Sequence, residues 1–144
     1  MKPRRPLPDP EPGTVDPDVF VNAWVGTPFK WDGRDRAGVD CWGLVWRFYF
    51  DVLGVSLPDW TVGDGGQAFA NALFVAQVQD HWNPFAEPRD FALVLCPQGR
   101  SAAHVGVFWR GGVVHSQSGK GVVWEALGRF KQGHPTAQFG EYVE

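Results

Sequence analysis

Three features are scarce in this sequence of 144 residues, and each scarcity excludes a class of protein. No run of 18 apolar residues occurs, so we expect no membrane-spanning helix and no membrane insertion. Basic residues are not in excess, because the formal net charge is −3, which argues against nucleic acid as a partner. Only two cysteines, Cys41 and Cys96, are present, which is too few for a disulfide framework.

The N-terminus lacks the apolar stretch that a secretory signal requires. Basic residues at positions 2, 4 and 5 are followed by no such stretch, so an ordinary signal peptide is not expected. Residues 1–17 hold six of the twelve prolines and are predicted to form a flexible arm. The alternative is a strap that docks onto a larger assembly. Residues 18–144 are predicted to form one domain with a dense core, since 44% of the chain is hydrophobic and 15% is aromatic.

Hydrophobic periodicity predicts helices in the first half of the domain and strands in the second. Helices are expected over residues 18–24, 41–53 and 67–81. The middle helix is the most apolar, with Asp40 as its N-cap and Gly54 beyond its end. Residues 27–38 are expected to be a loop, and Pro84 is expected to stop the third helix. Strands are expected over residues 91–96, 104–109, 113–117, 121–125 and 137–143. This order of helices and an antiparallel sheet predicts an α+β domain.

The most informative residue is Cys41, which stands where the loop turns into the apolar helix. The positive end of a helix stabilises a thiolate, so the pKa of this thiol is expected to fall. His104 lies on a predicted strand further along the chain and would supply the base that such a nucleophile needs. The two residues together indicate a cysteine hydrolase.

A third group is needed to orient the imidazole of His104, and His115 is the candidate. If Phe108 pairs with Val113 across a four-residue loop over residues 109–112, His115 stands opposite Gly106 on the same face as His104. The two backbones are then about 7–8 Å apart, near enough for the imidazoles to meet. A three-residue loop would place His115 on the other face of the sheet.

Other interpretations of these residues stay open on the sequence alone. A cysteine at a helix start is often a small core residue, and a histidine on a strand is often structural. Cys96 ends an apolar run, so it is interpreted as a buried strand thiol, with a bridge to Cys41 as the alternative. Zinc could draw on Cys41, Cys96, His104 and His115, although no Cys-x-x-Cys or His-x-x-x-His spacing supports it.

The ordered motifs of the chain resemble those of the NlpC/P60 family of papain-like peptidases. The resemblance covers about residues 18–126 and rests on Gly54 and segments 26–31, 38–45, 57–58, 104–107 and 114–115. It implies a papain-like fold with the nucleophile at the start of a central helix packed on an antiparallel sheet. It implies Cys41 as nucleophile, His104 as base and His115 as the orienting group, with no metal and no cofactor. The backbone N–H of Cys41 would contribute to the oxyanion hole.

The same resemblance implies a substrate and a setting. The substrate would be bacterial peptidoglycan, cleaved in its stem peptides, typically between D-glutamate and diaminopimelate. The form of the motif around Cys41 is similar to that of short members found in tail clusters of phages and gene transfer agents. Such a protein would be made in the bacterial cytoplasm, join tail-tip or hub proteins, and act in the periplasm of a target cell. The alternatives are a structural component of the tail tip and an amidase or acyltransferase.

Several side chains near Cys41 are candidates for binding that substrate. The cationic candidates for its carboxylates are Lys30, Arg34 and Arg36, and the aromatic candidates for the groove are Phe29, Trp31, Trp42 and Trp60. Solvated loop charges and core packing are the alternatives for these two sets. The family usually has tyrosine at the position of Phe29 and serine at that of Trp42. In those relatives the tyrosine hydroxyl hydrogen-bonds within the active site. Loss of one such donor is expected to reduce the catalytic rate on the order of tens- to hundreds-fold.

Overall fold

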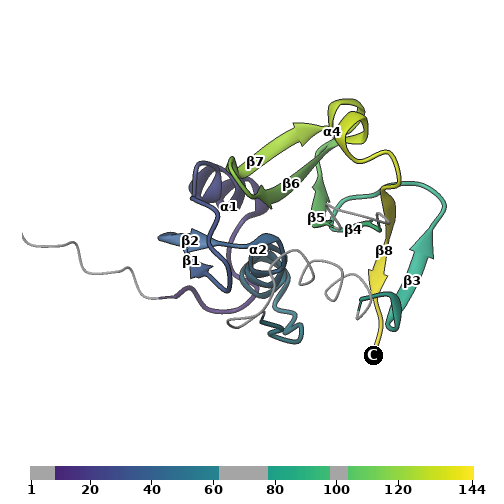
Figure 1. Ribbon diagram of the computed structural model, residues 1–144. Coiled ribbons are helices and arrows are strands. Elements are labelled where there is room, and N and C mark those ends of the chain that lie inside the picture. Colours follow the sequence, from purple (N-terminus) through teal and green to yellow (C-terminus); the bar gives the residue numbers. More distant parts are fainter. Residues whose placement is uncertain (1–8, 62–77, 98–103) are drawn as a thin grey trace, which may run out of the picture.

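A six-stranded antiparallel sheet forms the centre of the protein (Figure 1). The computed structural model describes residues 9–61, 78–97 and 104–144. The strands are β3 (Trp82–Phe85), β4 (Leu93–Cys96), β5 (His104–Trp109), β6 (Gly112–Gln117), β7 (Gly121–Ala126) and β8 (Gln138–Tyr142). Their order in the sheet is β3-β8-β4-β5-β6-β7. The five strands predicted from the period-two pattern are therefore confirmed.

Two helices with aspartate N-caps precede the sheet. Helix α1 (Pro17–Trp24) has Asp16 as its N-cap, whose carboxylate accepts from two backbone N–H groups of the first turn. Helix α2 (Cys41–Phe48) has Asp40 as its N-cap, and that carboxylate accepts from the N–H of Gly43 at 2.7 Å. Both helices begin where an extended residue supplies the oxygen that satisfies the first N–H groups. The predicted cap at Asp40 is confirmed.

Helix α2 is continued by a π-helical turn, η1 (Tyr49–Leu53), and ends at Gly54. Gly54 has φ of 70°, the left-handed conformation that favours glycine at a helix end. The sequence predicted one helix over 41–53, and this extent is confirmed, although its last turn is wider than an α-helical turn. Two carbonyls of η1, those of Phe50 and Asp51, accept hydrogen bonds from Gly13 and Val15 at 2.9 and 3.0 Å.

Residues 9–16, which precede α1, are held against α2 and η1. Besides its two backbone hydrogen bonds to η1, Asp9 pairs with the guanidinium of Arg47 at 3.1 Å, and Val15 packs on the core. The prediction of a flexible arm over residues 1–17 is therefore wrong for residues 9–16. The low hydrophobicity that suggested an arm carries no information about backbone hydrogen bonds to a helix. Residues 1–8 lie outside the described part of the chain.

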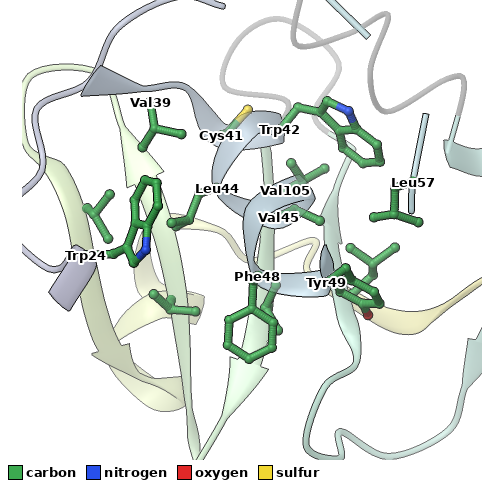
Figure 2. Close-up of a cluster of buried hydrophobic side chains, with 14 of the residues drawn as sticks. Trp24, Val39, Cys41, Trp42, Leu44, Val45, Phe48, Tyr49, Leu57 and Val105 are labelled. Atoms are coloured by element: carbon green, nitrogen blue, oxygen red, sulfur yellow. The ribbon is translucent and has the colours of Figure 1, made fainter. Parts of the chain in front are cut away.

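Each face of the sheet carries its own core. Val107 and Val114 face α1 and α2, and Figure 2 shows the apolar cluster around α2 with Cys41 at the start of that helix. Val94 and Val113 point the opposite way and pack with Phe130 of helix α4 (Leu127–Gly133). The alternation of strand side chains thus places the contacts of α2 on one face and those of α4 on the other.

The structure also contains elements that the sequence did not predict. The predicted loop includes a small hairpin of β1 (Arg34–Asp35) and β2 (Gly38–Val39). Pro84, expected to stop a helix, lies within β3, where an edge strand tolerates its missing N–H. Helix α4 was not predicted either. The helix expected over 67–81 falls mostly outside the described residues. Within the described ranges, no helix is long and apolar enough to cross a membrane.

Candidate active site

Cys41 is the first residue of α2 and lies against the start of β5. Only 1% of its surface is exposed. The backbone N–H groups of Val105 and Trp42 are directed at its sulfur and lower the pKa of the thiol, although burial outweighs them. Figure 2 shows Cys41 and Val105 in the same cluster around α2. Val105 directly follows His104 in the sequence, so the start of α2 lies beside the start of β5.

The pKa of Cys41 is raised to about 12, and not lowered as the sequence suggested. Burial of the thiol is the largest cause, and the carboxylate of Asp40 adds to it. The backbone N–H groups of Val105, Trp42 and Cys41 favour the thiolate but do not offset the lost hydration. The expected low pKa is therefore wrong for this buried state. A reaction at this sulfur requires a base that removes its proton.

The imidazoles of His104 and His115 are in direct contact. Nε2 of His104 and Nδ1 of His115 are 2.8 Å apart, and both residues are buried. They stand on neighbouring strands, β5 and β6, which pair Phe108 with Val113. This is the register that the sequence analysis required for the two histidines to share a face.

A two-residue turn sets that register. Trp109 pairs with Gly112, which leaves Arg110 and Gly111 as the turn between β5 and β6. Both turn residues have positive φ, 50° for Arg110 and 75° for Gly111, as in a type I′ turn. The type I′ geometry matches the twist of the two strands and so fixes their pairing.

Glu125 of β7 contacts the other side of His115. Its Oε1 is 2.8 Å from Nε2 of His115, so a carboxylate follows the two imidazoles in one chain of hydrogen bonds. In β7, Val123 stands opposite His115, and Glu125 lies two residues further on the same face. Sequence analysis missed Glu125, because placing it requires the register of a second hairpin. The only signal was its alternation with Val123.

Two rings, one in α4 and one directly after it, pack against the two histidines. His134 stacks on His104 with centroids 5.1 Å apart, and Phe130 lies edge-on to His115 at 4.9 Å. Burial lowers the pKa of all three histidines: well below 6.5 for His104, to about 4 for His115 and below 6.5 for His134. The charges of His115 and His134 depress the pKa of His104 further, whereas Glu125 opposes the fall for His115.

Arg34 holds the cap of α2 from outside. Its guanidinium donates to the carboxylate of Asp40 at 2.9 Å, to that of Asp59 at 2.8 Å and to the carbonyl of Trp60 at 2.6 Å. A fourth bond reaches the carbonyl of Gly33 at 2.8 Å. The predicted substrate ligand Arg34 is thus engaged within the protein, where it positions Asp40 and the first turn of α2.

Gly43 permits this close packing. A Cβ at that position would lie 2.4 Å from the carbonyl oxygen of Gly33 and 2.5 Å from Nη1 of Arg34. Since real Cβ atoms do not approach backbone that closely, a larger residue at this position would displace the loop from the helix. The cap, the guanidinium and the first turn of α2 therefore depend on one another.

The remaining predicted binding residues differ in exposure. Trp42 is fully buried: its Nε1 donates to the carbonyl of Pro58 at 2.8 Å and its ring stacks on Trp60 at 4.6 Å. The expectation that Trp42 lines an open groove is therefore wrong. Phe29 and Trp31 are half-buried and meet edge to face at 4.9 Å. The exposed cationic side chains of this region are Lys30 and Arg36.

The two cysteines are not bridged, and no metal cluster forms around them in the described part of the chain. Both Cys41 and Cys96 carry free thiols, so the alternative of a bridge between them is wrong. Among residues 9–61, 78–97 and 104–144, no group of three or more His, Cys, Asp or Glu side chains is placed to hold a metal ion. The described residues thus offer a buried thiol at the start of α2 and two linked imidazoles on β5 and β6.

A cavity of about 530 Å³ lies at a different place, between the end of η1, the start of β4 and the end of β8. Its lining includes Tyr49, Arg89 and Tyr142 but none of the three residues Cys41, His104 and His115. The cavity is therefore separate from the candidate active site.

A thiol at the start of a helix, packed on an antiparallel sheet that carries two bonded imidazoles, defines an α+β domain of the papain-like type. Residues 26–135 match the model of the NlpC/P60 family. The chain therefore belongs to the NlpC/P60 family, and both the resemblance and the fold predicted from the sequence are confirmed.

Several relatives and solved structures are similar to this chain. A probable endopeptidase of Haemophilus influenzae is 31% identical over 103 residues, covering 65% of this chain and 58% of the relative. The probable endopeptidase NlpC of Escherichia coli is 27% identical over 111 residues, covering 74% and 64%. The NlpC/p60 domain of the peptidoglycan hydrolase SagA superposes with a TM-score of 0.58 at 20% identity, covering 90% of this chain and all of that domain. The chain spans less than two thirds of the length of these two curated relatives.

Proposed function

We propose that this protein is a cysteine peptidase that hydrolyses peptide bonds in the stem peptides of bacterial peptidoglycan. The observation that carries the proposal is the 2.8 Å contact of His104 with His115, next to the strand position that the Cys41 sulfur reaches. The family of the chain, the relatives named probable endopeptidases and the structural likeness to a domain of a peptidoglycan hydrolase support it.

The proposed reaction begins with proton transfer from the Cys41 thiol to His104, because burial holds the thiol protonated. The sulfur forms a bond to the carbonyl carbon, and the resulting oxyanion is stabilised by backbone N–H groups that include that of Cys41. His104 then gives its proton to the leaving amine, and a thioester remains on Cys41. Water attacks the thioester with His104 as base, which releases the acid and restores the thiol.

The finer parts of the proposal concern the bond and the setting. The bond is that between D-glutamate and diaminopimelate, and the protein acts in a phage-like tail, bound to tail-tip or hub proteins. It is made in the bacterial cytoplasm and works in the periplasm of the target cell. The form of the motif over residues 40–45, which resembles that of the tail-cluster members of the family, supports this setting.

A second candidate is a structural component of the tail tip with weak or no catalysis. Two observations favour it: the thiol of Cys41 is 1% exposed, and Phe29 has no hydroxyl to offer to the site. An amidase or acyltransferase would use the same thiol and imidazoles on another acyl substrate. Products formed with and without an added amine acceptor distinguish these from a peptidase.

The test is digestion of purified Gram-negative peptidoglycan by the wild type, Cys41→Ala and Cys96→Ala, with products identified by mass spectrometry. Cys96 is the matched control, because it is the other buried free thiol and has no part in the proposed reaction, although it stands opposite His104 in the sheet. We expect new free amino groups on diaminopimelate with the wild type and Cys96→Ala, and none with Cys41→Ala. Hydrolysis by a folded Cys41→Ala protein would contradict the mechanism. No release by a folded wild type would favour the structural role.

A further inference from the structure

Glu125 ends a chain of hydrogen bonds that starts at His104. The two links, His104 Nε2 to His115 Nδ1 and His115 Nε2 to Glu125 Oε1, are each 2.8 Å long. The His115 side chain has no exposed surface, whereas that of Glu125 is 18% exposed. This chain of hydrogen bonds therefore runs from the buried base to a carboxylate that is partly exposed at the protein surface.

An ionised carboxylate fixes where the protons of this chain reside. Because it can only accept, His115 must donate from Nε2 to Glu125. In the neutral imidazole Nδ1 of His115 is then the acceptor, so His104 must donate to it from Nε2. Nδ1 of His104 is left without a proton. That nitrogen is the one on His104 that can take the proton of the Cys41 thiol.

We infer that Glu125 is a positioning residue that holds His104 in the tautomer required for proton transfer from Cys41. The inference rests on the proposed function, because it assigns His104 the role of base. Glu125 contacts His115 and acts on His104 through that ring. The carboxylate also favours the imidazolium that exists while the proton is on the histidines.

The other charged groups around His115 act in the opposite direction. His134, which follows the last residue of α4, and Lys120, in the turn between β6 and β7, both disfavour a positive charge on His115. A positive charge on His104 of β5 is likewise disfavoured by positive charges on His115 and His134. Glu125 is the group of β7 that favours the charge on His115, by a hydrogen bond and by its field.

Without the Glu125 carboxylate, nothing fixes which nitrogen of each imidazole carries the proton. His115 can then place its proton on Nδ1 and donate it to Nε2 of His104. In that arrangement the proton of neutral His104 is on Nδ1, and the ring cannot accept another one from the thiol. A fraction of the molecules is therefore inactive, although the fold and the nucleophile are unchanged.

The first experiment measures the alkylation rate of Cys41 by iodoacetamide at neutral pH, followed by intact mass, in a Cys96→Ala background. We expect Glu125→Ala to slow alkylation by about 10- to 100-fold and Glu125→Gln, which keeps an acceptor oxygen, by less than about tenfold. The matched control is Glu141→Ala on β8, which removes a carboxylate bonded to Asn83 on the same sheet and should leave the rate unchanged. An undiminished rate in a folded Glu125→Ala protein would overturn the inference.

This readout needs no substrate, so it separates the role of Glu125 from the proposed function. A slower Glu125→Ala reaction supports the inference even if the protein releases nothing from peptidoglycan. Conversely, a protein that cleaves peptidoglycan with equal rates in wild type and Glu125→Ala would retain the proposed function and lose the inference.

The second experiment observes the tautomers directly, by ¹⁵N NMR of the imidazoles in wild type and Glu125→Ala. The signals are assigned with His81→Gln and His134→Gln variants. We expect protons on Nε2 of both His104 and His115 in the wild type, and a shift of the His115 proton toward Nδ1 in Glu125→Ala. A merely structural loss would not move these signals between tautomers. A wild type with the His104 proton on Nδ1 would overturn the inference.

Discussion

The imidazoles of His104 and His115 are uncharged at neutral pH because both are buried. Water cannot solvate a positive ring there, and each ring disfavours charge on its neighbours. A neutral imidazole is the form that accepts a proton from the thiol. Burial thus raises the pKa of Cys41 and also keeps its proposed base, His104, in the neutral form that can accept a proton.

The lowered pKa values link folding stability to pH. In the unfolded chain His115 binds a proton below about pH 6.5, whereas in the folded protein it does so only near pH 4. Between these values the unfolded state binds more protons, so the free energy of unfolding falls as pH falls, by up to about 1.4 kcal/mol per unit for one histidine. Urea unfolding at several values between neutral pH and pH 4 measures this fall.

The matched comparison is His115→Gln, which should show a shallower fall over the same window. His104 and His134 contribute in the same direction in both proteins, whereas the raised pKa values of Asp40 and Asp51 act in the opposite direction. The difference between the two curves therefore reports the titration of His115 and its effect on His104. Parallel curves would contradict the lowered pKa.

The sequence could predict the residues that carry a local pattern. Cys41 was found from the loop-to-helix transition, and His115 from the register of one hairpin, which the structure confirms. Glu125 could not be found in this way, because its contact depends on two successive registers. The raised pKa of Cys41 could not be predicted either. The sequence shows that the thiol begins a helix, but its burial, which raises the pKa, arises only in the folded protein.

The hairpin of β1 and β2 positions α2 through Arg34. Replacement of Arg34 and of its neighbour Arg36 should therefore affect stability differently. Arg34→Ala leaves the buried Asp40 carboxylate without its cation, so we expect a loss of about 3 kcal/mol in the free energy of unfolding. Arg36, two residues along in the same hairpin, is exposed, and Arg36→Ala should change stability by less than about 0.5 kcal/mol. Thermal and urea unfolding of the two variants measure the contrast.

The same pair tests how Arg34 functions. An Arg34→Ala protein with unchanged stability and a raised KM would mean that Arg34 binds substrate and not the helix cap. A raised KM confined to Arg36→Ala would assign substrate binding to the exposed cation. The four hydrogen bonds of the Arg34 guanidinium lead us to expect the loss of stability.

Elements were predictable where their pattern of side chains was regular. The buried strands alternate or are continuously apolar, and all five were located. Strand β3 was missed because Pro84 reads as a helix stop, yet an edge strand accommodates it. The two-residue strands β1 and β2 are too short to show a period, and they exist because Arg34 pairs with Val39 across the turn.

The segment over residues 9–16 ties the N-terminal part of the chain to the centre of the fold. Removal of residues 1–15 deletes two backbone hydrogen bonds to η1, the Asp9–Arg47 pair and the packing of Val15, while Asp16 still caps α1. We expect a loss of about 2 to 4 kcal/mol in the free energy of unfolding, measured by urea denaturation. Removal of residues 1–8 leaves these contacts in place and is the control. Equal stability of the two truncated proteins would contradict a structural role for residues 9–15.

The nucleophile and the imidazoles belong to the two different cores of the sheet. Cys41 packs with the cluster around α2, and His115 contacts Phe130 in the cluster around α4. Composition and length predicted one dense core and one domain, but they contain no information about how side chains divide between the faces of a sheet. The site therefore depends on the packing of both clusters and on the sheet that joins them.

The two-residue turn of Arg110 and Gly111 has a consequence for how this domain can change in evolution. Substitutions in the turn that keep positive φ leave the histidines facing one another. Insertion or deletion of a single residue there would move His115 to the opposite face, together with its partner Glu125, and separate both from His104. Among descendants of this domain that keep the activity, the length of this hairpin should be as invariant as the identity of its histidines.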